Sequence, residues 1–375
     1  MAKPSSAALL VVIALAAAAA TGKSRADKAA PADRCVAETP FGLFGPDRRA
    51  VRLDDRLRLY RELGARWVRF NSTIPPSPSH GMSDPTESPR FEGQGGQVFL
   101  SVINPTLFSG GTDPGPLDAY AAGLRSAIER YRPAMIAVEN EADNAPYTMP
   151  AAAYLSELHV ACQIAHQQSV ACTDSGLTSK MQIALLVEWD LSKGKPDDAR
   201  RDARFLALWY ADHPAPDAAP EDLAAFLQRV GVSRARAMDA GLAAAGADRV
   251  DLHWYMRPNP ALGEPEQDGL LLGRVIAMLR ARTGLPVAAG EVGFDSPHMA
   301  DAELTADDVE HLATTLARQD ARPIIIWNPG AGLFGANPHA LSLVDATGNP
   351  LPSAEGLQRA SAQLHDKFAR CAVAP

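Results

Sequence analysis

Short apolar runs of β type recur along the chain, and stretches with a helical period lie between most of them. The runs are apolar at nearly every position, which is typical of parallel strands buried on both faces. They predict strands at 41–45, 66–70, 97–103, 134–140, 170–175, 249–255, 286–291 and 322–327.

Helical patterns fill most of the gaps between these runs. In residues 53–63 the leucines and Tyr60 recur on one face, and Thr305 with Asp308 resembles a capping box at the start of a later helix. The same reasoning predicts helices at 116–131, 150–168, 269–282, 305–319 and 354–369.

Two stretches break this alternation. Residues 72–96 are rich in Pro, Ser and Gly and show no clear helical pattern. More than 70 residues separate the fifth and sixth strands, and their pattern predicts three helices, at 179–190, 197–211 and 220–245. The whole predicts an α/β protein, a single (β/α)8 TIM barrel over residues 35–375 with a helical insertion between strands 5 and 6. A doubly wound open sheet is the alternative.

The first 20 residues have the pattern of a secretory signal peptide. Lys3 precedes an apolar run over 7–20 that ends in small residues, and residues 21–34 are polar and predict a flexible leader. A membrane anchor is the alternative, but the run of about 14 residues is shorter than the roughly 20 that cross a bilayer. The sequence therefore predicts a secreted or periplasmic protein, with no membrane partner after signal cleavage.

Charge and cysteine content narrow the function further. The 36 Lys+Arg against 44 Asp+Glu give a net charge of −8, which argues against a nucleic-acid partner. Export permits disulfides, and we predict Cys35–Cys371 and Cys162–Cys172, with four free thiols as the alternative. No close Cys-x-x-Cys or His pair is present, so we expect no metal site and no cofactor.

Polar and aromatic residues gather where the predicted strands end. In a (β/α)8 barrel these carboxyl ends meet at one face and carry the active site. The strand-end residues are Arg69 and Asn71, Glu139-Asn140-Glu141, His253-Trp254-Tyr255, Glu291, and Trp327-Asn328.

Glu141 and Glu291 would face each other across the barrel mouth. Two such carboxylates can cleave a glycosidic bond, because one protonates the leaving oxygen while the other attacks the sugar or activates water. Trp327 would offer a flat apolar surface to a sugar ring. Since side chains alternate along a strand, Glu139 should point the same way as Glu141. Glu139 could then pair with a core arginine or serve as the acid instead.

The pattern resembles clan A of the glycoside hydrolases, which are retaining (β/α)8 enzymes. The clan carries Asn-Glu after strand 4, His-x-Tyr at strand 6, Glu at strand 7, Trp at strand 8 and often Arg at strand 2. The closing LVDATGNPLPSAEG also resembles the tail of such enzymes. The matching residues are Asn140-Glu141, His253, Tyr255, Glu291, Trp327 and Arg69.

This resemblance implies a retaining hydrolase that acts on an oligosaccharide, polysaccharide or glycoside. Glu141 would be the acid/base and Glu291 the nucleophile, while Asn140 would hold the sugar 2-hydroxyl and Tyr255 would orient Glu291. Many clan members have Pro after the strand-4 Glu, whereas this chain has Ala142. A glycan-binding barrel without catalysis therefore stays open as the alternative function.

Two other motifs do not support competing functions. The run Gly330-x-Gly332-x-x-Gly335 fits a dinucleotide fingerprint, but Pro338 follows at once where a helix is needed, so we expect a loop. A Gly-x-Ser-x-Gly elbow is absent, which disfavours a serine esterase. Aromatic residues make up only 6% of the chain, and this predicts a short glycan site.

Overall fold

The structure is a computed structural model that describes most of the chain after residue 38. The described residues are 39–44, 53–74, 87–144, 147–207, 209–210, 212–215, 217–255, 266–294, 304–327, 342–345 and 349–369, with backbone alone at 266–269 and 365–369.

The eight strands form one parallel sheet in the order β5-β4-β3-β2-β1-β8-β7-β6. Two isolated parallel bridges, Thr173–Arg249 and Leu177–Leu252, join the β5 edge to β6 and close the sheet into a barrel. This closure confirms the predicted TIM barrel over the open doubly wound sheet. The strands are β1 Phe41–Phe44, β2 Trp67–Thr73, β3 Gln97–Ile103, β4 Met135–Val138, β5 Ala171–Thr173, β6 Val250–Trp254, β7 Val287–Val292 and β8 Ile324–Trp327.

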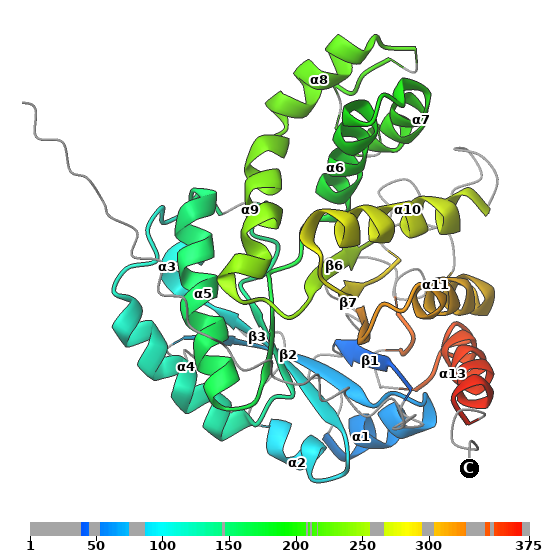
Figure 1. Ribbon diagram of the computed structural model, residues 1–375. Helices are drawn as coiled ribbons and strands as arrows, with labels where there is room; N and C mark the ends of the chain where they lie inside the picture. Colours follow the sequence, from blue (N-terminus) through cyan, green and yellow to red (C-terminus); the bar gives the residue numbers. More distant parts are fainter. Residues whose placement is uncertain are drawn as a thin grey trace, which may run out of the picture.

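Helices surround the sheet on its outer side (Figure 1). The capping box predicted at Thr305 is present, because its hydroxyl accepts from Asp308 N–H and the Asp308 carboxylate accepts from Thr305 N–H. The helices outside the β5–β6 stretch are α1 Leu53–Glu62, α2 Ser88–Glu92, α3 Pro105–Phe108, α4 Leu117–Tyr131, α5 Ala151–Gln167, α10 Glu266–Thr283, α11 Ala306–Arg318 and α13 Ala354–Ala369.

The prediction of no helix over 72–96 is wrong at its end, where the short helix α2 lies. Pro89 stands in its first turn, a position that tolerates proline, and Phe91 is buried edge-on against Tyr60 of α1. Burial of one aromatic ring thus stabilises a helix of five residues whose polar composition hides it. The first part of the same stretch belongs to β2, which pairs with β3 as far as Thr73.

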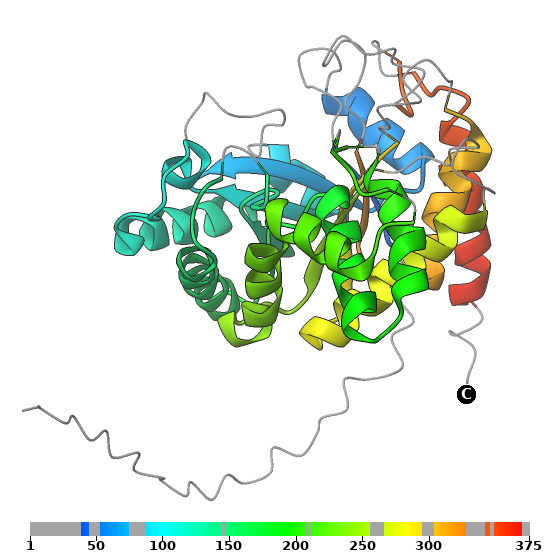
Figure 2. The same cartoon turned by 90° about the horizontal axis from the view of Figure 1, so that it is seen from above.

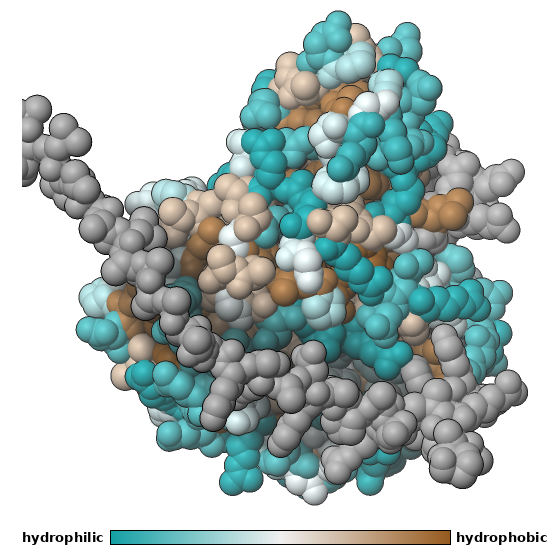
Figure 3. All heavy atoms as spheres, in the orientation of Figure 1, coloured by the Kyte–Doolittle hydropathy of each residue, from teal (hydrophilic) through white to brown (hydrophobic). Residues whose placement is uncertain are grey.

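The chain between β5 and β6 holds α6 Ser179–Ser192, α7 Pro196–Leu206, α8 Pro220–Arg229 and α9 Val232–Ala245. The helix predicted over 220–245 is broken at Gly231, whose φ of 87° is left-handed. Figure 1 shows α7 and α8 projecting beyond the ring of helices, and in the view from above of Figure 2 helices lie around the sheet. Hydrophilic residues cover most of that projection in Figure 3. That these helices are an insertion into a simpler barrel stays a prediction.

A small apolar cluster lies inside the barrel, separate from the large core between sheet and helices. Tyr255 and Trp67 pack against it, and this cluster supports the site described below. Its members are Phe44, Phe99, Met135, Ala137, Ile325 and Trp327.

One predicted disulfide is present, and the other cannot be placed. Cys162 of α5 and Cys172 of β5 are bonded, with their Cα atoms 5.3 Å apart. The predicted Cys35–Cys371 pair lies outside the described residues, as do the signal peptide, the leader, Asn328 and the Gly330–Gly335 run. Within the described residues, no helix is long and apolar enough to cross a membrane.

Candidate active site

Arg69 of β2 lies at the centre of the site and is fully buried. Its guanidinium donates to Gly290 O at 2.6 Å, to Asn140 Oδ1 at 2.8 Å and to Ser101 Oγ at 2.8 Å. The rings of Phe44 and Phe99 lie 5.4 and 5.3 Å from its central carbon. Because a guanidinium keeps its charge when buried, Arg69 supplies a fixed positive charge that joins β2, β3, β7 and the turn after β4.

Glu291 of β7 is held by two of the predicted partners. Its Oε2 lies 3.4 Å from Arg69 Nη1, and its Oε1 accepts a hydrogen bond from the Tyr255 hydroxyl. Burial, and then the charge of Glu291, raise the pKa of Tyr255 well above its usual value, so this hydroxyl remains a donor. Oε2 is buried and accepts no hydrogen bond from the described residues. Tyr255 thus anchors one carboxylate oxygen, while the other is held by the charge of Arg69 without a hydrogen bond from the described residues.

Trp327 ends β8 beside this pair. Its ring packs edge-on against Tyr255, with centroids 5.5 Å apart, and only 7% of the residue is exposed. Gly293 makes this arrangement possible, because a Cβ there would lie 2.7 Å from the Tyr255 ring. Trp327 therefore supports the Tyr255 ring, and little of its own surface is exposed to a ligand.

Glu141 lies in the turn after β4 with a left-handed φ of 50°. Its backbone N–H donates to Ser175 O at 3.0 Å, while its carboxylate lies 3.3 Å from His253 Nδ1 and accepts from Asn144 Nδ2 at 3.3 Å. Burial alone would raise the pKa of Glu141, but the hydrogen bond and charge of His253 outweigh it, and the pKa is lowered. A general acid needs a raised pKa, so the ligand-free site departs here from the role implied by the sequence.

His253 of β6 links the two carboxylates. It is paired with Glu291 in the register of β6 and β7, and it is fully buried. Burial by itself lowers the pKa of His253, yet the charge of Glu291 and the bonds to Asp251 and Glu141 raise it to about 10. At neutral pH His253 is therefore a buried cation.

Asp251 is a buried member of this network that the strand-end pattern does not predict. Its Oδ2 lies 3.4 Å from His253 Nε2 and 3.9 Å from Arg69 Nη1, and its Oδ1 accepts from Gly290 N–H at 2.7 Å. Asp174 in turn accepts from Asp251 N–H at 2.6 Å. The sequence offered a clue, because Asp251 stands two positions before His253 on a strand and so faces the same side.

Gly176 provides the space for the His253 ring. Its φ of +65° is left-handed, and a Cβ there would lie 2.3 Å from His253 Cδ2. No other residue type fits this position without moving the imidazole. The loop after β5 thus fixes one face of the ring.

The expectation that Glu139 and Glu141 point the same way is wrong. β4 ends at Val138, and both glutamates have left-handed φ angles, so the alternation of a strand does not apply. Glu139 accepts from Asn104 N–H at 2.6 Å and from the Tyr147 hydroxyl at 2.7 Å. Burial, and then the charge of Glu157, raise the pKa of Glu139 well above its usual value. Among the described residues Glu139 pairs with no arginine, and its partners differ from those of Glu141.

The turn that carries Glu141 is fixed from both sides. Asp143 accepts from Thr178 N–H at 2.9 Å and from its hydroxyl at 2.5 Å. Lys180 Nζ donates to Asn144 Oδ1 at 3.4 Å, and Asn144 reaches the Glu141 carboxylate. Asn140 uses its amide oxygen on Arg69, which leaves its NH₂ group directed to other acceptors.

The site brings together all seven predicted residues, which lie in one network around Arg69. They are Arg69, Asn140, Glu141, His253, Tyr255, Glu291 and Trp327. Such a site can present two carboxylates, one held rigidly and one on a turn, to a ligand at the mouth. Among the described residues no group of His, Cys, Asp and Glu has the geometry of a metal site.

Comparison with known proteins finds solved structures with a similar fold. No protein-family model matches the sequence, and no curated protein matches it. A solved structure of a glucosidase from Croceicoccus marinus superposes with a TM-score of 0.52 at 11% identity, covering 87% of this chain and 66% of that chain. The GH39 enzyme from Xanthomonas axonopodis pv. citri gives the same four values. GH5_18 from Bifidobacterium longum subsp. longum gives a TM-score of 0.50 at 14% identity, covering 87% and 79%.

The chain has the barrel fold of these enzymes. The resemblance to clan A glycoside hydrolases, expected from the strand-end motifs, is thereby confirmed for the fold. The chain spans slightly less than two thirds of the length of the first two structures.

Proposed function

We propose that this protein is an exported, retaining glycoside hydrolase. The observation that carries the proposal is the state of Glu291, whose Oε1 is anchored by Tyr255 while Oε2 is buried without a hydrogen bond from the described residues. Oε2 pairs with Arg69 at 3.4 Å but accepts no hydrogen bond from the described residues, so it keeps a lone pair with which to attack a carbon. Its partner Glu141 is 19% exposed in its side chain and can reach a ligand.

In the first step Glu291 Oε2 attacks the anomeric carbon, and the bond from that carbon to the leaving oxygen breaks. The proton of Glu141 passes to the leaving oxygen, so the aglycone departs as an alcohol. Arg69 and His253 hold their positive charges beside both carboxylates throughout. The product of this step is a glycosyl ester on Glu291, with Glu141 ionised.

In the second step Glu141 takes a proton from water, and the water oxygen attacks the anomeric carbon. The ester bond breaks, Glu291 regains its charge, and the sugar leaves with its original configuration. Asn140 supports both steps, because its free NH₂ group can donate to a sugar hydroxyl while Arg69 holds its oxygen.

The lowered pKa of Glu141 in the ligand-free site requires that substrate binding help to protonate it. A sugar in the mouth removes water from this partly exposed carboxyl, and such desolvation raises a carboxyl pKa. After the ester forms, Glu141 must act as an ionised base, and the imidazolium of His253 stabilises that ionised form. The contact between His253 and Glu141 therefore favours the second step, in which Glu141 is an ionised base, more than the first step, in which it is an acid.

The comparisons support the substrate class only in general terms. The fold is shared with structures described as a glucosidase and as GH39 and GH5_18 enzymes, so we propose a glycoside, oligosaccharide or polysaccharide substrate. Export is supported by the apolar run over 7–20 and by the Cys162–Cys172 disulfide, which is typical of oxidising compartments. N-terminal sequencing of the protein recovered from the growth medium or periplasm tests export.

The activity is tested with a panel of chromogenic aryl glycosides. We expect the wild type to release the phenol from at least one, and Glu291→Gln to lose at least roughly 10³-fold in kcat. Glu129→Gln removes an exposed carboxylate on α4 and should match the wild type. Equal activity in Glu291→Gln and wild type would contradict the proposal.

A glycan-binding barrel without catalysis is the second candidate. The ionised state favoured for Glu141, together with Ala142 in place of proline, supports it. Binding of oligosaccharides to wild-type protein without hydrolysis of any panel member would favour this function over the first.

A further inference from the structure

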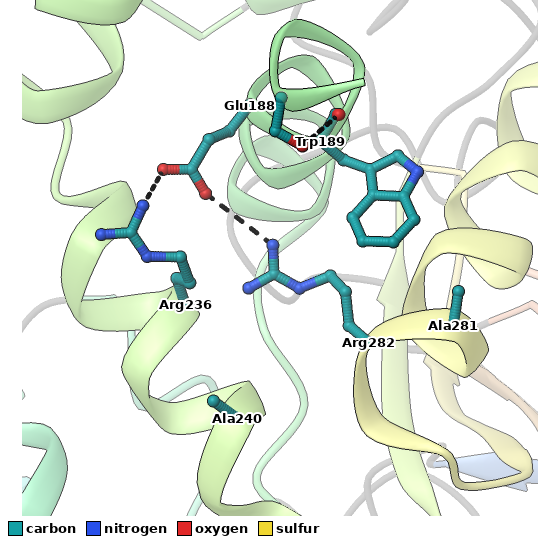
Figure 4. Close-up of a pocket in the computed structure, with 7 residues that line it drawn as sticks. Glu188, Trp189, Arg236, Ala240, Ala281 and Arg282 are labelled. Carbon is teal, nitrogen blue, oxygen red and sulfur yellow. Dashed lines mark hydrogen bonds and ion pairs between the residues drawn. The ribbon is translucent and has the colours of Figure 1, made fainter.

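A cavity of about 420 Å³ lies outside the barrel, between α6, α9 and α10 (Figure 4). This volume is within the range of small-molecule sites, roughly 300–1,000 Å³. It is separate from the catalytic centre. Its lining includes Glu188, Trp189, Arg236, Ala240, Ala281 and Arg282.

Helix α6 contacts the candidate active site at its start and lines the cavity near its end, so the length between these two points separates the two sites. Ser179 at its start accepts a hydrogen bond from Tyr255 N–H at 2.8 Å, so this end touches the candidate active site. Glu188 lies nine residues further on, which is about 14 Å along a helix that rises 1.5 Å per residue. A ligand in the cavity therefore does not touch the catalytic carboxylates.

The polar wall of the cavity has balanced charge. Glu188 Oε1 lies 2.5 Å from Arg236 Nη1, and its Oε2 lies 3.7 Å from Arg282 Nη1. Arg282 Nε is also 3.3 Å from Asp239 Oδ2. Two guanidinium groups thus face two carboxylates. This balance disfavours a phosphate or another strongly charged ligand, and it leaves planar donors and acceptors for hydroxyl groups.

The other wall is apolar. Figure 4 shows the Trp189 indole beside Ala281, on the opposite side of the cavity from Arg236. Trp189 is only partly buried, and Ala281 on the same side of the cavity is small, whereas Ala240 lies on α9 on the side of Arg236. Lys193 Nζ lies over one face of the Trp189 ring, 4.4 Å from its centroid, so a sugar would stack on the other face. An aromatic ring on one side and hydrogen-bonding planar groups on the other match the apolar face and the hydroxyl rim of a sugar.

We propose that this cavity is a second carbohydrate site that binds a neutral glycan, with one sugar ring on Trp189 and its hydroxyls on Glu188 and Arg236. That the glycan is the enzyme's own substrate rests on the proposed function. Binding there would hold a polymer on the outside of the barrel while another part of it occupies the mouth.

The experiment uses the full chain with Glu291→Gln, so that binding is measured without turnover. Cellohexaose, xylohexaose and mannohexaose are titrated separately by calorimetry, with hydrogen exchange to locate protected segments. We expect two sites per chain for at least one probe, with protection at the ends of α6 and α10. Trp189→Ala should weaken the second site at least tenfold, and Ala240→Arg, which fills the cavity, should abolish it.

Trp209→Ala is the matched control, because it removes a partly buried tryptophan that does not line the cavity. It should bind like the parent. A single site in the parent, or two sites that persist unchanged in Ala240→Arg, would overturn the proposal. Arg236→Ala gives a second test at a half-exposed side chain if Trp189→Ala does not fold.

Failure of the second carbohydrate site and failure of the proposed hydrolase activity give different results. In the active background, Trp189→Ala should hydrolyse aryl glycosides like the wild type but act more slowly on a polymer at low concentration. Hydrolysis without Trp189-dependent binding overturns this site alone. Trp189-dependent binding without hydrolysis of any panel member overturns the hydrolase and keeps the site.

Discussion

His253 Nδ1 lies 3.3 Å from Glu141 Oε1 and joins strand β6 to the turn after β4. Through this contact each residue stabilises the charged form of the other. Although burial opposes each charge, the pKa of Glu141 is lowered and that of His253 is raised to about 10. The candidate acid therefore sits beside a cation over the whole neutral range.

Replacing His253 should change the pH profile of hydrolysis. His253→Gln removes the cation that favours ionised Glu141, so the pKa of Glu141 rises and the basic limb of kcat/KM moves to higher pH. The matched control is His166→Gln, which alters a half-exposed histidine paired with Asp248 at 2.9 Å. Its profile should match the wild type. An unchanged basic limb in His253→Gln would show that Glu141 is not the group that titrates.

Tyr255→Phe tests how firmly Glu291 must be held. The variant keeps the ring on Trp327 but loses the hydrogen bond to Oε1, and hydrogen bonds to charged groups contribute about 1.5–3 kcal/mol. We expect kcat to fall roughly 10- to 100-fold. Tyr210→Phe removes the same atom from a ring packed on Phe226 and should leave kcat unchanged. A wild-type rate in Tyr255→Phe would argue against this orienting role.

Gly176→Ala should damage both stability and activity. The left-handed backbone alone costs about 1–2 kcal/mol for an alanine, and the new Cβ meets the His253 ring at 2.3 Å. Gly194→Ala is the matched control, since its φ is +69° but nothing lies within 4 Å of the added Cβ. Denaturant unfolding should show a larger loss for Gly176→Ala, and only this variant should lose activity. Equal losses in both would mean that the ring contact is unimportant.

Asp174 should make the fold less stable as pH rises. Burial, and then the charge of Asp251, raise its pKa from 3.8 to about 8 in the folded protein. The folded state therefore holds a proton that the unfolded chain releases, and stability falls between pH 4 and 8. Asparagine at position 174 cannot ionise. The melting temperature of Asp174→Asn should therefore equal that of the wild type below pH 4 and exceed it by a growing margin as the pH rises to 8.

The control for that series is Asp212→Asn, a surface carboxylate 72% exposed in its side chain. The difference in melting temperature between Asp212→Asn and the wild type should not grow with pH. If Asp174→Asn behaves the same way, the burial cost assigned to Asp174 is absent.

The strands and the mouth of the barrel were predictable because both follow simple periodicities. The eight apolar runs predicted the sheet, and polar residues at the ends of four of these runs predicted the site residues Arg69, Glu141, His253 and Glu291. Strand ends meet at one face whatever the loops do, so the residues could be grouped without knowing their contacts. The roles of these residues in catalysis stay a prediction.

Contacts that depend on backbone detail were not predictable. The direction of Glu139 follows from two left-handed residues in a row of three, which no spacing reveals. The pKa of Glu141 depends on the position of one imidazole ring and on Gly176, more than 30 residues away, that makes room for it. The helix α2 depends on the burial of Phe91 against Tyr60 rather than on its own pattern.

Azide rescue of two alanine variants tests the central claim most directly, with product configuration read by NMR. If Glu291 is the nucleophile, azide in Glu291→Ala attacks the sugar from the vacated side and gives a glycosyl azide of inverted configuration. In Glu141→Ala an activated aryl glycoside still forms the ester, and azide then gives the retained product. The proposed mechanism predicts an inverted glycosyl azide from Glu291→Ala and a retained one from Glu141→Ala. A retained azide product from Glu291→Ala, or undiminished hydrolysis without azide, would contradict it.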